Sequence, residues 1–319
     1  MSIFIAVVTR SGLAAVWPLL ILAVIEITFS FDNAVVNSQV LTKMSRFWRL
    51  MFLTVGIIIA VFGVRLILPL ILVSSTTGES LGGVLNLALN NPEDYETQLL
   101  KAYPVIAAFG GVFLLMVGLR FLAEDHAIKW LRWVEAPIAS LKKPWLIPIL
   151  GAVIAAAFIG LVLKPGDSKV LIAAIAGAVI FLIIKSLSVL VETRYAGSKH
   201  SGWINFLYLE VLDASFSFDS VVAAFAISKD IVIIAAGLGI GAFFVRSITI
   251  HLLEHNTIAS YRYLVHGAHY AITMLAVVLL LSVTIHIPEA VTGILSVTVI
   301  GLAIYTSRVA AKKDKSLPN

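Results

Sequence analysis

The stretch Glu26-Ile27-Thr28-Phe29-Ser30-Phe31-Asp32-Asn33 recurs, with small changes, as Asp213-Ala214-Ser215-Phe216-Ser217-Phe218-Asp219-Ser220. Both copies lie inside apolar segments that are long enough to cross a bilayer. A charged carboxylate at the centre of a membrane helix costs about 2.5–3.5 kcal/mol on insertion scales. Glu210, three residues before the second copy, adds a fifth acid to the four in the two copies. Such groups persist where a cation or a proton offsets the cost, so the repeated stretch predicts a functional site inside a membrane domain.

The composition agrees with a membrane protein. Of 319 residues, 60% are hydrophobic and 13% are charged, and the mean hydropathy is +1.02. Soluble domains carry about 25% charged residues. We therefore predict an all-α, polytopic protein with a single transmembrane domain over residues 1–319. The first apolar segment is too long for the core of a signal peptide, so we expect it to be retained as a helix.

Nine apolar segments are predicted to span the membrane. They cover approximately residues 14–40, 48–73, 102–122, 146–163, 168–191, 204–227, 230–252, 266–285 and 287–307. Most of the 23 Lys and Arg residues fall in alternate loops. By the positive-inside rule, the N-terminus is expected outside and the basic C-terminal tail in the cytoplasm of a plasma (inner) membrane protein.

The repeat extends beyond the two motifs. Gly56 and Gly237 each precede a Val-Arg pair, with the arginines (Arg65 and Arg246) nine positions further on. We therefore predict two repeats, 13–123 and 204–286, joined by two helices in 124–203 and followed by a last helix and tail in 287–319. Helices 1 and 6 would run in opposite directions, because five spans separate them. This is the inverted-topology layout of many secondary transporters, whose site lies near the membrane midplane.

Helical geometry divides each motif. At ~100° per residue, Glu26, Ser30 and Asn33 share one stripe of a helix, and Asn37 extends it. Asp32 lies about a third of a turn away from that stripe. Either the helix unwinds near Phe31-Asp32, or each helix serves two polar surfaces. We favour the first interpretation, because discontinuous helices are common at transporter sites.

The residue types favour a hard divalent cation. The chain has no cysteine, so a metal would meet oxygen ligands, which suit Mg²⁺, Ca²⁺ or Mn²⁺. An alternative is that the acids only pair with Arg65 and Arg246. Arg65 either pairs with Glu26 or snorkels to the interface, and Arg246, near the end of its span, is expected to snorkel. The candidate metal ligands are Glu26, Asp32, Asn33, Glu210, Asp213, Asp219 and Ser220.

No enzyme signature is present. The sequence lacks Gly-x-Ser-x-Gly, His-Glu-x-x-His and Walker A motifs, so we expect neither hydrolysis nor nucleotide-driven transport. The net charge of +5 is distributed among the loops and does not indicate a nucleic-acid partner. The lipid bilayer is the expected environment, and the sequence leaves the oligomeric state open.

The motifs resemble those of the TerC/Alx family of integral membrane proteins. The family's first motif, roughly Glu-x-x-Leu-Ser-x-Asp-Asn, is matched by Glu26, Ser30, Asp32 and Asn33, and its second by Asp213, Phe216, Asp219 and Ser220. The sequence from Leu209 to Asp219 is most similar to that of the uncharacterised TerC-like branch. Val222 stands where the family often has proline, which weakens the expectation of a broken sixth helix.

The resemblance implies a role in metal homeostasis. It favours Mn²⁺ as the exported substrate over Ca²⁺ and Mg²⁺, which the residue types alone also allow. Protons are the expected counter-ion on the same acids. Two other functions stay open. One is export of a cationic organic solute such as a basic amino acid, and the other is a non-transporting membrane scaffold for stress responses.

Overall fold

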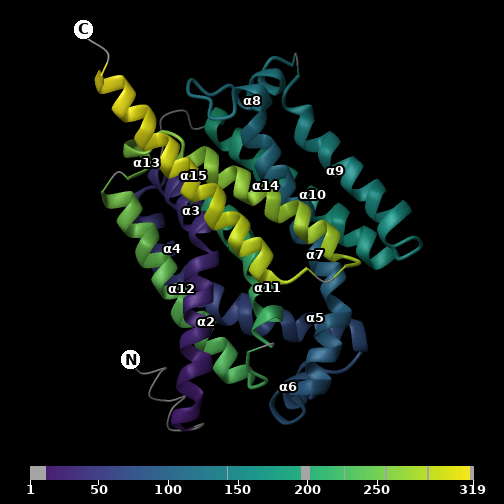
Figure 1. Ribbon diagram of the computed structural model, residues 1–319. Coiled ribbons are helices and arrows are strands. Elements are labelled where there is room, and N and C mark those ends of the chain that lie inside the picture. Colours follow the sequence, from purple (N-terminus) through teal and green to yellow (C-terminus); the bar gives the residue numbers. More distant parts are fainter. Residues whose placement is uncertain are drawn as a thin grey trace.

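The computed structural model describes residues 12–141, 143–194, 202–225, 227–255, 257–285 and 287–316, and these ranges contain helices and no strand (Figure 1). The α-helices are α2 (Val16–Phe29), α3 (Phe31–Thr42), α4 (Arg46–Ile58), α5 (Leu68–Thr77), α6 (Leu81–Asn90), α7 (Pro92–Ala123), α8 (Arg132–Ala139), α9 (Leu146–Phe158), α10 (Ser168–Arg194), α11 (Gly202–Ala224), α12 (Ile231–Glu254), α13 (Thr257–Ser260), α14 (Leu264–Ser282) and α15 (Glu289–Ser316). A 3-10 turn, η1 (Leu13–Ala15), precedes α2, and two π-helical segments, η2 (Ile59–Ile67) and η3 (Ile159–Leu163), follow α4 and α9.

Seven helical segments in the described ranges are long and apolar enough to cross a membrane, or eight if the bent pair α2–α3 is one span. The predicted all-α, polytopic membrane architecture is therefore confirmed, but the described ranges contain seven or eight candidate spans rather than the nine predicted. The predicted span at 204–227 corresponds to α11, which has 23 residues but is not among the seven. Three acids, Glu210, Asp213 and Asp219, lower its apolar character.

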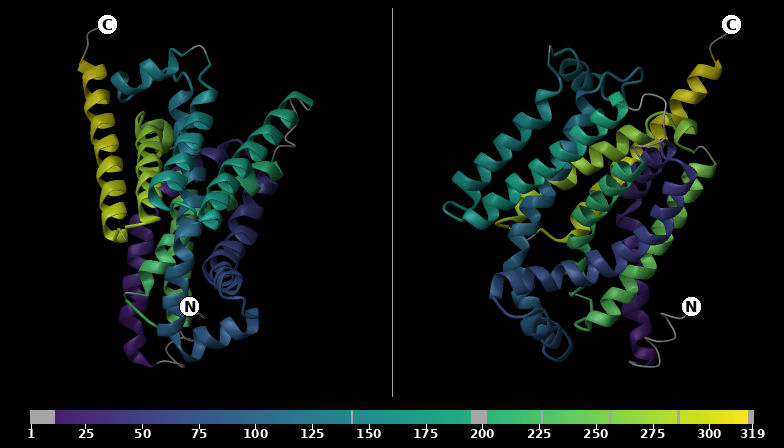
Figure 2. Two further views of the ribbon diagram at one scale, coloured as in Figure 1. Left: turned by 90° about the vertical axis from the view of Figure 1, so that its right-hand side faces the viewer. Right: turned by 180° about the vertical axis from the view of Figure 1, so that it is seen from behind.

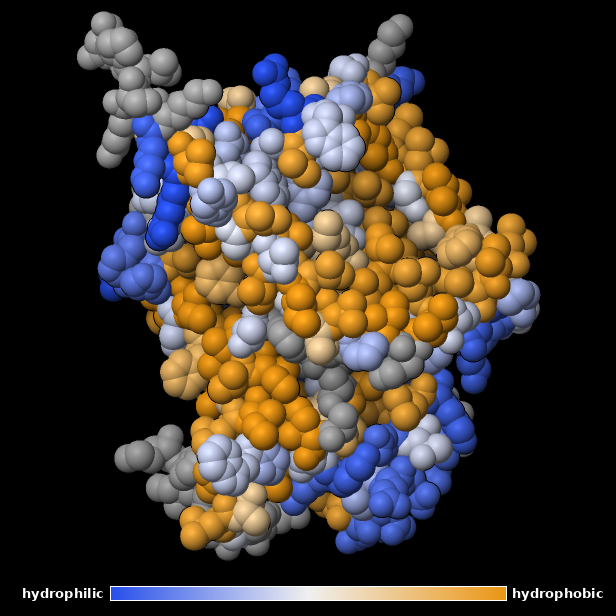
Figure 3. Space-filling model, in the orientation of Figure 1, coloured by the Kyte–Doolittle hydropathy of each residue, from blue (hydrophilic) through white to orange (hydrophobic). Residues whose placement is uncertain are grey.

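On the face shown in Figure 3, apolar side chains cover the middle of the molecule, and charged side chains gather toward its upper and lower ends. Large apolar side chains are widely exposed, as Leu161 on η3 and Ile154 on α9 illustrate. A surface of this kind would associate in water, because soluble monomers rarely expose large contiguous apolar patches. Lipid chains are the environment that suits it.

Helix α7 runs through the centre and packs against α10, α14, α9 and α11. In the left view of Figure 2, α15 lies on one side of α7 and α14, and α10 extends on the other side. The beginning of α2 and the end of α15 lie at opposite ends of the molecule (Figure 1). Two further contacts position the acidic motifs, because α2 packs along α12 and α11 packs on α4 and η2.

The two motifs differ in backbone form. Ser30 separates α2 from α3, whose axes are bent by 53°. The predicted interruption near Phe31-Asp32 is thus present within one residue in the first motif. In the second motif it is absent, because α11 runs without a break from Gly202 to Ala224. Residues 203–224 contain no proline or glycine, the residues at which sharp helix kinks usually occur.

Candidate functional site

Glu26 of α2 forms a buried ion pair with Arg65 of η2. The glutamate is 1% exposed, and it also accepts a hydrogen bond of 3.1 Å from the Ser30 hydroxyl. Arg65 donates a second hydrogen bond, 2.9 Å long, to the Ala60 carbonyl. Arg65 therefore pairs with Glu26 and does not snorkel to the membrane interface. The π-helical form of η2 around Arg65 is a type of segment that often occurs at functional sites.

Asp213 of α11 forms the corresponding pair with Arg246 of α12. Its Oδ1 accepts hydrogen bonds from the side-chain amides of Asn33 at 2.8 Å and Asn37 at 3.1 Å, both on α3. The Arg246 guanidinium lies 3.4 Å from the centre of the Phe52 ring. The expectation that Arg246 snorkels is therefore wrong, since Asp213 and Phe52 hold its side chain in the interior.

Both ion pairs border one small buried cavity. Its volume is about 10 Å³, which is close to the space that one water molecule needs. The two copies of the motif therefore meet, although they are far apart in the sequence. The polar side chains that line the cavity are Glu26, Asn33, Asn37, Arg65, Asp213 and Arg246.

Glu210 is on α11, three residues before Asp213, and is 7% exposed, but it does not line the cavity. Neither of its carboxylate oxygens has a hydrogen-bond partner. Its side chain packs against Gly56 of α4, where an added Cβ would lie only 2.5 Å from Glu210 Oε1. Glycine at position 56 thus makes room for the carboxylate between α11 and α4.

Asp32 serves a different surface. It accepts hydrogen bonds from the Ser296 hydroxyl of α15 at 3.2 Å and from the Asn33 backbone amide at 2.9 Å. It does not line the small cavity. The first motif therefore has two polar surfaces, as the second geometric alternative states, even though its helix is interrupted.

Two predicted ligands remain, Ser220 and Asp219. Ser220 is buried in α11 but does not line the cavity, and the side chain of Asp219 lies outside the described residues. Among the side chains that the structure describes, no group of three or more Asp, Glu or His is arranged to hold a metal ion.

Sequence reasoning missed Ser296 and left Asn37 out of the ligand set. Asn37 could have been included, because it continues the stripe of Glu26, Ser30 and Asn33 on the helix. Ser296 gives no such signal, since it lies in a helix that matches neither repeat.

Charge is not balanced at this centre. Its described carboxylates are Glu26, Asp213 and the neighbouring Glu210, whereas Arg65 pairs with Glu26 and Arg246 with Asp213. Asp32 belongs to the other polar surface. Buried acceptor oxygens also lack donors, and these belong to Glu26 (Oε2), Asn33 (Oδ1), Asn37 (Oδ1) and Glu210 (Oε1 and Oε2). Two donors of the arginines, Arg65 Nε and Arg246 Nη1, likewise have no acceptor. A cluster of buried, unpartnered oxygens is costly unless a cation or protons satisfy it.

The fold and these paired charges define a polytopic helical membrane protein with a polar centre. Over residues 31–314 the chain matches the family described as "Protein of unknown function (DUF475)", and it belongs to that family. The match includes Asp32, Asn33 and the whole second motif and begins after Glu26. No curated protein and no solved structure matches the chain.

Proposed function

We propose that the protein is a secondary transporter of divalent metal cations, with Mn²⁺ as the expected substrate and export as its direction. The observation that carries the proposal is the cluster of buried oxygens without donors on Glu26, Asn33, Asn37 and Glu210. Carboxylate and amide oxygens are the ligands that hard divalent cations take in proteins. The preference for Mn²⁺ rests on the resemblance to the TerC/Alx family.

The predicted inverted repeat gains support from the two ion pairs. Each pair joins the first acid of a motif to the arginine of the following helix, nine residues after a glycine (Gly56 or Gly237). The packing is reciprocal as well, since α2 lies on α12 and α11 lies on α4 and η2. In this arrangement α11 is a ninth span, and the N-terminus lies outside with the C-terminus in the cytoplasm.

In the proposed mechanism, Arg65 and Arg246 pair with Glu26 and Asp213, and the substrate cation competes with the guanidinium groups for these carboxylates. Glu210 and the free amide oxygens of the asparagines supply further ligands. The bend at Ser30 allows α3 to reorient Asp32, so that Asp32, Asp219 and Ser220 join the site on one side of the transport cycle. Protons then replace the metal on the same carboxylates.

Two alternatives can be compared with this geometry. A cationic organic solute needs a chamber far larger than the cavity of about 10 Å³ between the ion pairs. The scaffold alternative draws support from the pairing of Glu26 and Asp213 with arginines, because such pairs can be purely structural. The transporter must bind a metal ion and the scaffold need not, so a metal-binding measurement distinguishes the two alternatives.

Calorimetric titration of the purified full chain with Mn²⁺, Ca²⁺, Mg²⁺ and lysine provides the test. We expect saturable binding of Mn²⁺, equal binding by the surface control Asp94→Asn, and loss of binding in Glu210→Gln. Heat with lysine alone would favour the organic-solute transporter. Absence of binding with all four compounds would refute the transporter proposal and leave the scaffold.

A further inference from the structure

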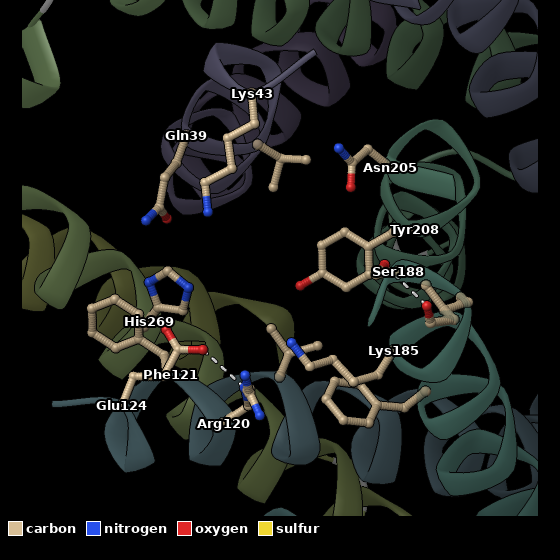
Figure 4. Close-up of a pocket in the computed structure, with 14 residues that line it drawn as sticks. Gln39, Lys43, Arg120, Phe121, Glu124, Lys185, Ser188, Asn205, Tyr208 and His269 are labelled. Carbon is tan, nitrogen blue, oxygen red and sulfur yellow. Dashed lines mark hydrogen bonds and ion pairs between the residues drawn. The ribbon is translucent and has the colours of Figure 1, made fainter. Parts of the chain in front are cut away.

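Three histidines gather around one phenylalanine where the end of α7 meets the start of α14. The Phe121 ring lies between the rings of His126 and His269, with distances of 4.3 and 3.8 Å between ring centres. His266 meets the same phenylalanine edge-on, and its ring centre lies 5.5 Å from that of His126. His269 and Phe121 also border the pocket in Figure 4. We call the three histidines the histidine cluster, and none of them lines the cavity of the acidic centre.

Glu135 of α8 is a buried carboxylate at this cluster. It is 3% exposed, and its Oε1 accepts hydrogen bonds from the Trp130 amide at 3.3 Å, the Leu131 amide at 3.1 Å and the Tyr270 hydroxyl at 3.3 Å. Its Oε2 lies 3.4 Å from His266 Nε2, but the two groups are not aligned for a hydrogen bond. One carboxylate therefore holds the start of α8 and also faces α14.

Within the described part of the chain, the other charges near the cluster supply no second buried anion. The carboxylates Glu124 and Asp125 are exposed, and they pair with Arg120 at 2.9 Å and with Lys129 at 2.7 Å. Lys43 of α3 extends toward the cluster and adds positive charge (Figure 4). The remaining cations on α8, before α14 and on α15 are Arg132, Arg262 and Arg308. The cluster can therefore neutralise one imidazolium but not two.

Histidine is the side chain whose charge changes between about pH 5 and 8. His126 and His269 each donate one ring N–H to a backbone carbonyl, at 3.0 and 2.8 Å, so the second ring nitrogen takes the proton on acidification. A first proton on His266 forms a charge pair with Glu135, which suits the packing. A second proton, on His126, places like charges 5.5 Å apart, where the surrounding rings limit screening by water.

We propose that the histidine cluster and Glu135 form a pH-sensitive contact that holds α8 and residues 124–131 on the start of α14. The contact persists at neutral and alkaline pH, and it is released as falling pH places more than one proton on the cluster. Trp130 and Val134 pack on the small apolar cluster that includes Phe121, which supplies the rest of the stability of the docked state. Because α14 packs on α3, the contact lies one helix away from the acidic centre.

Distances between two nitroxide labels test the proposal, and the chain has no native cysteine to interfere. Labels at Trp133→Cys on α8 and Val309→Cys on α15 report the docking of α8, because both positions are exposed. Labels at the exposed Phe243→Cys on α12 and at Val309→Cys report the rest of the fold. Pulsed EPR measures both distances on the purified full chain in neutral detergent between about pH 8 and 5, the range in which histidine titrates.

Two variants should shift the release in opposite directions. Glu135→Gln removes the buried negative charge, so a single proton suffices and release occurs at higher pH. His126→Gln removes the imidazole that faces His266, so release requires lower pH. Each shift should reach at least about one pH unit, which is a tenfold change in proton concentration. The matched control, His255→Gln on α12, removes an exposed histidine outside the cluster and should leave the release unchanged.

In the wild type, we expect the distance between positions 133 and 309 to increase as the pH falls, while the distance between 243 and 309 stays constant. Three results would overturn the proposal: no change with pH, a change in both distances together, or release at the same pH in either variant and in the control. If Glu135→Gln does not fold, His126→Gln carries the test, because its side chain is only half-buried. Metal binding is measured separately, so failure here would leave the transporter proposal unaffected.

Discussion

At the residue scale, Asp213 and Arg246 depend on each other. Both are buried, and removing one partner from a buried ion pair commonly costs about 3–5 kcal/mol, because the other charge remains without compensation. We expect Arg246→Gln to lower the unfolding temperature strongly and Arg246→Gln/Asp213→Asn to recover part of that loss. Thermal unfolding of the four proteins in this double-mutant cycle measures the coupling, and strictly additive effects would contradict the pairing.

Substitution of Glu210 should have the opposite effect on the unfolding temperature. Its carboxylate has no hydrogen-bond partner to lose, so Glu210→Gln is expected to keep or raise the unfolding temperature. Glu26→Gln serves as the comparison, because it leaves the Arg65 guanidinium buried without its anion and should destabilise the protein. A larger loss of stability in Glu210→Gln than in Glu26→Gln would show that Glu210 has a structural partner.

Individual residues show how far the sequence predicts the site. The cost of acids in a membrane was sufficient to single out Glu26, Asp32, Glu210 and Asp213, all of which are buried. The behaviour of Arg246 was mispredicted, because its position along the helix says nothing about Asp213 or Phe52 on other helices.

At the scale of elements, the contact between α2 and α12 depends on small residues. A Cβ at Gly241 would lie 2.5 Å from the Glu26 Cβ and 3.0 Å from the Ala23 carbonyl. We expect Gly241→Ala to force the helices apart and to lower the unfolding temperature, with overpacking costs of about 1–3 kcal/mol. Thermal unfolding in detergent measures this effect.

The matched control is Gly301→Ala on α15. An added Cβ there meets no atom within 4 Å, and alanine has the higher helix propensity. Gly301→Ala should therefore be neutral or slightly stabilising. If Gly241→Ala were equally harmless, the close packing of α2 on α12 would be disproved.

The sequence predicts where the helices lie better than it predicts where they are interrupted or which other helices they contact. Apolar length located most of the spans, and the interruption expected near Phe31-Asp32 occurs at Ser30, whereas α11 is continuous. Helix α15 matched neither repeat in the sequence, yet its Ser296 contacts Asp32. Contacts of this kind depend on how distant helices pack, which hydrophobic periodicity does not encode.

At the scale of the whole molecule, the crossing of α11 decides the topology. Six of the apolar spans begin at or after Pro92, and α11 would make seven. Asp94 and Lys312 lie near the two ends of this part of the chain, so they face opposite sides of the membrane only if α11 crosses.

The absence of native cysteine makes this topology measurable with single substitutions. We expect a membrane-impermeant maleimide to label Asp94→Cys in intact cells and to label Lys312→Cys only after permeabilisation. Labelling of both positions from the same side would contradict the ninth span and, with it, the inverted repeat.

The central claim is that the unpartnered oxygens of the acidic centre bind a transported cation. Mn²⁺ flux into liposomes that contain the purified protein and an entrapped Mn²⁺-sensitive dye tests it most directly. Glu210→Gln is the informative variant because its stability should be preserved, and Asp94→Asn is the matched control on the surface. The account predicts flux for the wild type and for Asp94→Asn, with at least about a tenfold loss in Glu210→Gln, equivalent to about 1.4 kcal/mol. Equal flux in folded Glu210→Gln, or no flux in the wild type, would contradict it.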